Sequence, residues 1–192
     1  MTNEKLAANR SRFISLCAKL YRNTGLADLA EWLDKSDFFT APASTRFHGA
    51  YEGGLVEHSL NVYDELQRLL AAYPEIQISE DSQIIVALFH DICKANMYKK
   101  EVKYRKDDNG KWETYDAYVS DEKLHYGGHG SKSVFILQNF IKLTPEEAVA
   151  INCHMGPWDG DNNAIAAAFE QCPLAWLLHV ADESATFIVE KI

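Results

Sequence analysis

Along most of the chain, hydrophobic side chains recur every three or four residues, and polar side chains fill the positions between them. This spacing gives each segment one apolar stripe and is typical of amphipathic α-helices. Ser79 is a suitable N-cap for one such helix, and the segment 144–147, Thr-Pro-Glu-Glu, has the form of a capping box with proline at the first helical position. Besides the helix that Ser79 caps, the pattern predicts helices over 4–21, 26–34, 55–73, 131–141, 144–155 and 172–190.

The periodicity changes between residues 98 and 119. Tyr98, Lys100, Val102 and Tyr104 alternate with their neighbours, and Asn109-Gly110 is a two-residue turn signal. We therefore predict an all-α fold, a helical bundle, with a β-hairpin insertion around 98–119. Because an isolated two-stranded hairpin is only marginally stable in water, we expect it to lie on the helical body.

Composition and charge limit the classes to which the chain can belong. Its 192 residues, 47% hydrophobic and 24% charged, are typical of one globular domain. We expect residues 1–192 to form a single domain, with a core over about 46–190 and N-terminal helices, 4–35, packed on it. The 19 Lys and Arg against 28 Asp and Glu give a net charge of −9, which disfavours binding of long nucleic acids.

The N-terminus and the cysteines favour a cytoplasmic protein. Segment 1–10 is polar and lacks the apolar core of a signal peptide, and no apolar run approaches the roughly 18 residues that cross a bilayer. Cys17, Cys93, Cys153 and Cys172 form no Cys-x-x-Cys pair and suit small buried residues in a reducing compartment. We expect no membrane partner.

Five polar side chains stand on apolar helical segments. His58 lies on the core-facing side of its predicted helix, His90 and Asp91 end a second helix, His154 ends a third, and Asp182 lies inside the last. A single histidine in such a place is more often a hydrogen-bonded core residue. Several buried polar groups from different helices instead suit a shared metal centre. Imidazole and carboxylate ligands fit Zn, Fe, Mn, Co or Ni better than a site that selects thiolates.

The order of these residues resembles that of the HD-domain metal-dependent phosphohydrolases. Segment 53–60, Gly-Gly-Leu-Val-Glu-His-Ser-Leu, looks like the first-histidine helix of that family, and segment 90–94, His-Asp-Ile-Cys-Lys, looks like its HDxxK signature. The segments that begin at His129 and His154 resemble the two additional histidines of members with a two-metal site. The resemblance covers about residues 46–182 and implies an HD-domain-like helical bundle.

The resemblance also implies a centre of two divalent ions, chosen from Fe, Mn, Co, Ni, Zn and Mg. The implied ligands of the first ion are His58, His90, Asp91 and Asp182. Those of the second are His129 and His154, with Asp91 bridging the two ions, and the implied catalytic residues are Asp91 and Lys94. Two cations about 4 Å apart lower the pKa of a bridging water and neutralise charge that develops on a phosphoryl oxygen.

Further side chains are candidates for roles around this centre. Lys94 can grip a phosphate oxygen, although a lysine at a helix C-terminus also complements the helix dipole. Arg46 and His48 precede the glycine pair and are candidates to bind a substrate phosphate from the rim, unless their loop is simply solvated. His179 either orients a metal ligand or is a packed, hydrogen-bonded histidine. We expect His125 to line the pocket or to lie on the surface.

We therefore predict a phosphohydrolase that uses a metal-activated water to hydrolyse a phosphoester of a nucleotide or related small molecule. One alternative is a 3′–5′ exoribonuclease-like phosphodiesterase on short RNA, since HD exonucleases share a similar glycine–histidine segment. Another is a non-catalytic HD module that senses a nucleotide or a metal. The hairpin interleaves basic and aromatic residues over 94–106, which suits base stacking, but the acidic stretch 107–122 cancels that charge. The oligomeric state stays open.

Overall fold

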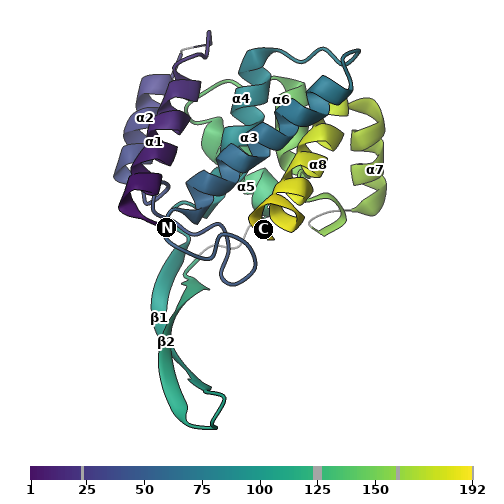
Figure 1. The fold of residues 1–192 in the computed structure, drawn as a ribbon. Helices are drawn as coiled ribbons and strands as arrows, with labels where there is room; N and C mark the ends of the chain where they lie inside the picture. Colours follow the sequence, from purple (N-terminus) through teal and green to yellow (C-terminus); the bar gives the residue numbers. More distant parts are fainter. Residues whose placement is uncertain (23, 123–126, 159–160, 192) are drawn as a thin grey trace.

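The computed structural model describes residues 1–22, 24–122, 127–158 and 161–191. It confirms a helical fold with one inserted β-hairpin (Figure 1). The α-helices are α1 (Asn3–Cys17), α2 (Leu26–Lys35), α3 (Gly54–Ala72), α4 (Glu80–Phe89), α5 (His129–Leu137), α6 (Pro145–Cys153), α7 (Asn162–Gln171) and α8 (Pro173–Phe187). The shorter elements are the 3₁₀ helices η1 (Ile92–Lys94), η2 (Gly156–Trp158) and η3 (Val189–Lys191) and the strands β1 (Tyr98–Lys106) and β2 (Trp112–Ser120).

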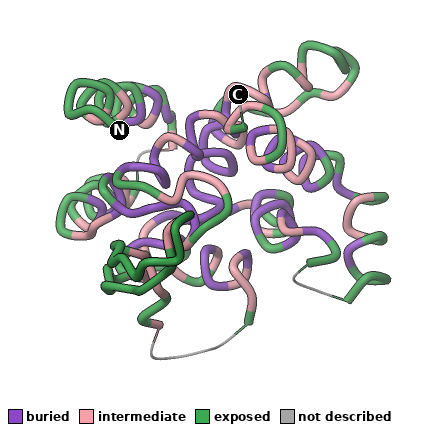
Figure 2. Tube along the Cα trace, turned by 60° about the horizontal axis from the view of Figure 1, so that its bottom comes forward, coloured by how far each residue is buried: buried purple, intermediate pink, exposed green. Residues whose placement is uncertain are grey.

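Helix α3 packs against α8, α4 and α1, and α6 packs against α8 and α5. On α3, the fully buried Leu55, Val62 and Leu66 repeat at the spacing of one helical face. His58 lies three residues after Leu55 and four before Val62, so the same periodicity turns its imidazole into the interior, where it is fully buried. Buried residues follow the inner sides of the helices in this way throughout the bundle (Figure 2).

Two predicted helix starts are confirmed by their capping hydrogen bonds. The Ser79 hydroxyl accepts a hydrogen bond from the backbone N–H of Ser82 at 3.1 Å. Thr144 and Glu147 form the reciprocal capping box, in which Thr144 N–H donates to the Glu147 carboxylate at 2.8 Å and Glu147 N–H to the Thr144 hydroxyl at 3.2 Å. Helix α7 is missing from the sequence prediction, although the Asp161 side chain caps it.

The position of the hairpin differs from the expectation. β1 and β2 pair in an antiparallel register from Tyr98 opposite Ser120 to Lys106 opposite Trp112, but the ribbon projects from one end of the helical body instead of lying on it (Figure 1). Most of its residues are exposed. The predicted two-residue turn is also wrong, because residues 107–111 form the connection and the Asp107 carboxylate accepts hydrogen bonds from Asn109 N–H and Lys111 N–H.

The N-terminal part joins the bundle through aromatic packing. The ring of Phe13 in α1 lies 5.2 to 5.5 Å from the rings of Phe38, Phe39 and Phe89. The division into a core of about 46–190 and packed N-terminal helices stays a prediction.

Among the described helices, none alone has the length and apolar character to cross a membrane, and only the bent pair of 162–171 with 173–191 passes that test, by length and composition.

Candidate metal centre

Polar side chains from four parts of the bundle meet in its interior. Helix α3 supplies His58 and α8 supplies Asp182, while His90 with Asp91 follows α4 and His154 follows α6. Their exposed fractions are all 8% or less. The packing of α3 on α4 and α8, and of α6 on α8, brings these positions together from sequence separations of up to about 120 residues.

His90 and His154 occupy equivalent positions at the ends of two helices. Each is the C-cap residue of its helix, α4 or α6. Their Nδ1 atoms lie 2.9 Å from the Ala87 carbonyl oxygen and 2.7 Å from the Ile151 carbonyl oxygen, respectively. Because a carbonyl oxygen only accepts hydrogen bonds, Nδ1 carries the proton in both rings. When either ring is neutral, Nε2 is therefore the nitrogen that carries the lone pair, and this atom faces Asp91.

His58 is oriented by a carboxylate in the same way. Its Nδ1 lies 2.8 Å from Glu190 Oε1 in η3, and the Asn61 side-chain amide donates to the same oxygen at 3.1 Å. Its Nε2 lies 3.1 Å from Asp182 Oδ1. Burial disfavours the charged form of His58, but Asp182 and Glu190 outweigh burial and raise its pKa to about 10. The carboxylates thus favour a positive charge at this point of the site.

The donor atoms converge on a small volume. His58 Nε2 and His90 Nε2 are 3.3 Å apart, and Nε2 of His90 and of His154 each lie 3.5 Å from an oxygen of Asp91. Asp91 Oδ1 and His154 Nε2 are buried with no hydrogen-bond partner among the described residues. Buried imidazole nitrogens and carboxylate oxygens this close together are a donor set that fits a divalent transition metal ion.

Lys94 forms a buried ion pair with Asp91. Its ammonium lies 2.6 Å from Asp91 Oδ2, and both side chains are buried. Burial alone would raise the pKa of Asp91, but Lys94 and His90 outweigh burial and hold this pKa well below its usual range. Asp91 is therefore an ionised carboxylate whose Oδ2 faces both the Lys94 ammonium and His90 Nε2 and whose Oδ1 faces His154 Nε2.

The sequence model of the family described as "HD domain" matches residues 55–186, more than half of the chain. The chain belongs to the HD-domain family. The match begins in α3 and ends in α8, so it contains all five buried side chains of the site. The predicted family and its helical fold are confirmed.

Among curated proteins, this HD domain is similar to the dihydroneopterin 2′,3′-cyclic phosphate phosphodiesterase of Methanocaldococcus jannaschii. The two are 36% identical over 84 residues, which are 42% of this chain and 31% of that protein. The chain therefore matches about a third of the length of this relative. No solved structure matches the chain.

The HD signature residues are brought together to different degrees. The ligand atoms of His58, His90 and Asp182 lie within 4.8 Å of one another, as do those of His90, Asp91 and His154. His129 at the start of α5 lies to one side, where its Nδ1 is 3.7 Å from Cys93 Sγ, and it forms a further group with Asp91 and Cys93. His125 lies outside the described residues.

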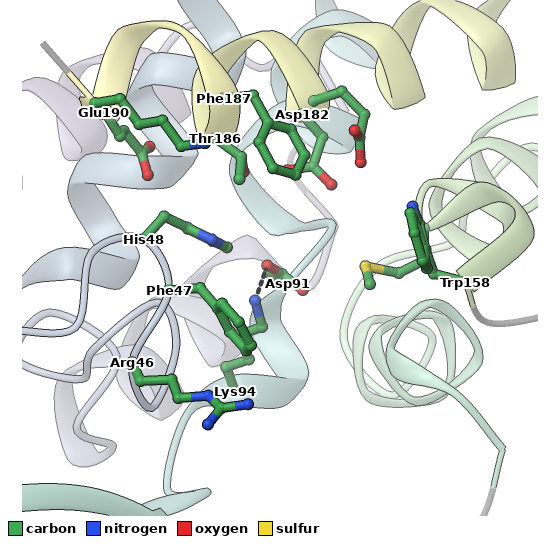
Figure 3. Close-up of a pocket in the computed structure, with 13 residues that line it drawn as sticks. Arg46, Phe47, His48, Asp91, Lys94, Trp158, Asp182, Thr186, Phe187 and Glu190 are labelled. Atoms are coloured by element: carbon green, nitrogen blue, oxygen red, sulfur yellow. Dashed lines mark ion pairs between the residues drawn. The ribbon is translucent and has the colours of Figure 1, made fainter.

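A cavity of about 490 Å³ opens onto this group of histidine and aspartate side chains (Figure 3). Asp91 and Lys94 lie in its wall, and the predicted rim residues Arg46 and His48 line it too. The His48 ring packs against His58 with 4.7 Å between ring centroids, and its Nε2 is buried without a hydrogen-bond partner among the described residues. The loop before α3 is therefore a wall of the cavity and not merely a solvated segment.

Sequence reasoning gave two residues beside the centre no role in it. Glu190, which holds His58, follows Asp182 by eight residues in a different helical segment, and Cys93, which lies beside Asp91 and His129, was assigned only a packing role. His179, for which two roles stayed open, donates from Nδ1 to the His154 carbonyl oxygen at 2.7 Å and stacks on Phe169. It is a packed, hydrogen-bonded histidine that braces the backbone of a candidate ligand.

Replacing Gly54 should disturb the cavity wall. A Cβ at this first residue of α3 would lie 1.9 Å from the Gly49 carbonyl oxygen, so Gly54→Ala must displace the loop that carries Arg46 and His48. We expect the free energy of unfolding to fall by about 1–3 kcal/mol, as for other overpacked sites, and KM for the phosphate ester of the function proposed below to rise. Urea denaturation and steady-state kinetics measure the two effects.

The matched control for Gly54 is Gly110 in the hairpin connection. Gly110 has a φ of 78°, and a Cβ there would meet no atom within 4 Å. Gly110→Ala should cost only about 1 kcal/mol of backbone strain and leave KM unchanged. Equal effects of the two substitutions on KM would contradict the assignment of the loop as a cavity wall.

Proposed function

We propose that this protein is a metal-dependent phosphohydrolase that acts on a phosphate ester of a nucleotide or related small molecule. The observation that carries this proposal is the convergence of three imidazole Nε2 atoms on the Asp91 and Asp182 carboxylates, beside a cavity that also contains the Lys94 ammonium. Membership of the HD-domain family supports the proposal independently, because the metal-dependent phosphohydrolases that the sequence resembles are HD-domain proteins.

The residues fit a centre of two divalent ions. In this proposal His58, His90, Asp91 and Asp182 hold one ion, and His129 and His154 hold the other together with Asp91. Two observations support the division: Asp91 has one oxygen near His90 and the other near His154, and the His129 side chain approaches Asp91 from α5. When bound, such ions lower the pKa of a coordinated water and neutralise charge on the phosphoryl group. Fe, Mn, Co, Ni, Zn and Mg are the candidates.

The other side chains of the chain bind and orient the ester. Lys94 lines the cavity with a buried ammonium, and a cation in a site that excludes water stabilises a phosphoryl oxygen more strongly than it would in bulk water. Arg46 and His48, from the loop before α3, are the further phosphate-binding candidates. The hydrogen bonds of His90 and His154 to helix carbonyls hold both rings in one orientation.

The size of the cavity favours a small substrate. About 490 Å³ lies within the range that small-molecule sites occupy. The relative from Methanocaldococcus jannaschii is named for a cyclic phosphate diester on a small heterocyclic compound. A cyclic 2′,3′-phosphodiester therefore belongs in any substrate panel, next to nucleoside mono- and triphosphates and short RNA.

The net charge of −9 continues to disfavour long nucleic acids. We retain the cytoplasmic location, with no membrane partner, as part of the proposal.

Removal of metal should abolish hydrolysis. We expect protein treated with a chelator and desalted to show no turnover of the panel, and one class of ester to be hydrolysed after addition of Mn²⁺, Fe²⁺, Co²⁺, Ni²⁺, Zn²⁺ or Mg²⁺. Products are resolved by chromatography, and bound metal is measured by mass spectrometry. Turnover that is equal with and without metal would contradict the proposal. So would absence of turnover in protein that is folded and loaded with each metal.

A further inference from the structure

Trp158 is an exposed tryptophan at the cavity. It is the last residue of η2, and its exposed fraction is 77% even though it lines the same cavity as Asp91 and Lys94. Within the part of the chain that the structure describes, no aromatic ring or cationic group packs against its indole. A large apolar ring left open at the mouth of a polar site is a surface that a ligand can cover.

The opposite walls of the cavity carry two more exposed rings. Phe47 and Phe187 have exposed fractions of 76% and 52%, and they extend into the same space from the loop before α3 and from α8 (Figure 3). One face of Phe47 is covered by the Arg46 guanidinium at 4.8 Å, and one face of Phe187 by the Lys191 ammonium at 4.6 Å. Of these three rings, Trp158 is therefore the one on which no described side chain stacks.

We propose that Trp158 is the stacking platform for a flat heteroaromatic ring of the substrate, a nucleobase or a pterin, while the phosphate of the same molecule lies at Asp91 and Lys94. The inference rests on the proposed function, because it takes the Asp91 side of the cavity as the phosphate end. It adds a specificity-determining residue and restricts the substrate class to phosphate esters that carry such a ring.

The chemistry of the mouth favours a planar ring over an aliphatic chain. Tryptophan offers a large, electron-rich face. Any nucleobase can stack on an aromatic side chain, because every base has a π-face. Met155 lines the cavity three residues before Trp158, and its flexible thioether can adapt to rings of different outline. The Arg46 and Lys191 cations at the other rings suit an anionic ester and would not favour a neutral lipid chain.

The test compares two esters that differ only by the ring. Guanosine 2′,3′-cyclic phosphate carries a base, and 1-O-methylribose 2′,3′-cyclic phosphate has the same phosphodiester without one. For Trp158→Ala we expect KM to rise about tenfold with the guanosine ester and to change less than about twofold with the methylribose ester, at unchanged kcat, because base–aromatic stacking contributes to binding and not to the chemical step. Trp158→Phe, which keeps an aromatic face, should restore KM to within about threefold of the wild type.

A tryptophan outside the cavity provides the matched control. Trp112 is 64% exposed and lies at the far end of the hairpin. Trp112→Ala should leave both KM values unchanged. If Trp158→Ala leaves the ratio of the two KM values as it is in the wild type, or if it raises both equally, the stacking assignment is wrong.

A binding experiment tests the inference without turnover. Guanosine 5′-monophosphate is titrated into chelator-treated protein while tryptophan fluorescence is recorded. We expect quenching in the wild type and in Trp112→Ala, and its loss in Trp158→Ala and Trp158→Phe. If neither cyclic ester is hydrolysed but another class of the panel is, the KM comparison uses that class. If no class is hydrolysed with any metal, the proposed function fails, and this titration alone decides the inference. Equal quenching in wild type and Trp158→Ala overturns it.

Discussion

Asp91→Asn should reduce kcat/KM for the hydrolysed ester by about a thousandfold or more, because it removes the carboxylate whose two oxygens face His90 Nε2 and His154 Nε2. The substitution preserves the shape of the side chain but removes its negative charge. The amide can no longer neutralise a metal ion or balance the buried Lys94 ammonium, which lies 2.6 Å from Asp91 in the wild type. The value of kcat/KM and the metal content, measured on the same preparation, should fall together.

The control for Asp91 separates loss of the site from loss of the fold. Asp108 lies in the hairpin connection and is exposed, so Asp108→Asn should retain full activity and metal content. Circular dichroism and a thermal melt of Asp91→Asn show whether the bundle is intact. A folded Asp91→Asn protein with activity within tenfold of the wild type would rule out the role that we assign to this carboxylate.

The largest effect on stability should come from Arg22→Met. Arg22 connects the starts of two helices: its guanidinium contacts the Asp81 carboxylate in the first turn of α4 and forms two hydrogen bonds with the Glu147 carboxylate in α6. Glu147 is fully buried and also accepts from the Ser82 hydroxyl at 2.7 Å. Without Arg22 the buried carboxylate loses its cation, so we expect the free energy of unfolding to fall by about 2–4 kcal/mol.

Urea denaturation measures this loss, and Arg12→Met is the matched control. Arg12 also forms a two-bond ion pair, with Asp64, but both of these side chains are more than 40% exposed. An exposed pair contributes only about 0–1 kcal/mol, so Arg12→Met should change the midpoint little. Equal effects of the two substitutions would show that burial of Glu147 does not determine how much the Arg22 ion pair contributes to the free energy of unfolding. The network matters for the site because α4 and α6, whose starts it joins, end at His90 and His154.

Much of the helical framework could be predicted from the sequence because its causes are local. Apolar periodicity and capping residues act within one or two turns, so Ser79 and Thr144 set the starts of α4 and α6 without help from the rest of the chain. Periodicity also turns His58 inward, and helix ends place His90 and His154 where ring N–H groups meet backbone carbonyls. Histidine and aspartate on apolar segments therefore indicated side chains that the structure brings close together.

Contacts between distant segments were beyond the reach of that reasoning. The hairpin was expected on the helical body, since isolated hairpins are weak, yet the tertiary structure extends it into solvent (Figure 1). Glu190 holds His58 across 132 positions of sequence, and Trp158 and Phe47 come to line one cavity from opposite walls. Sequence alone thus determined which helical segments carry inward-facing histidine and aspartate side chains, because this follows from spacing within one helix. Only the tertiary structure decided which atoms meet, which rings remain open to a substrate and where the cavity lies, because each depends on how helices pack across the whole chain.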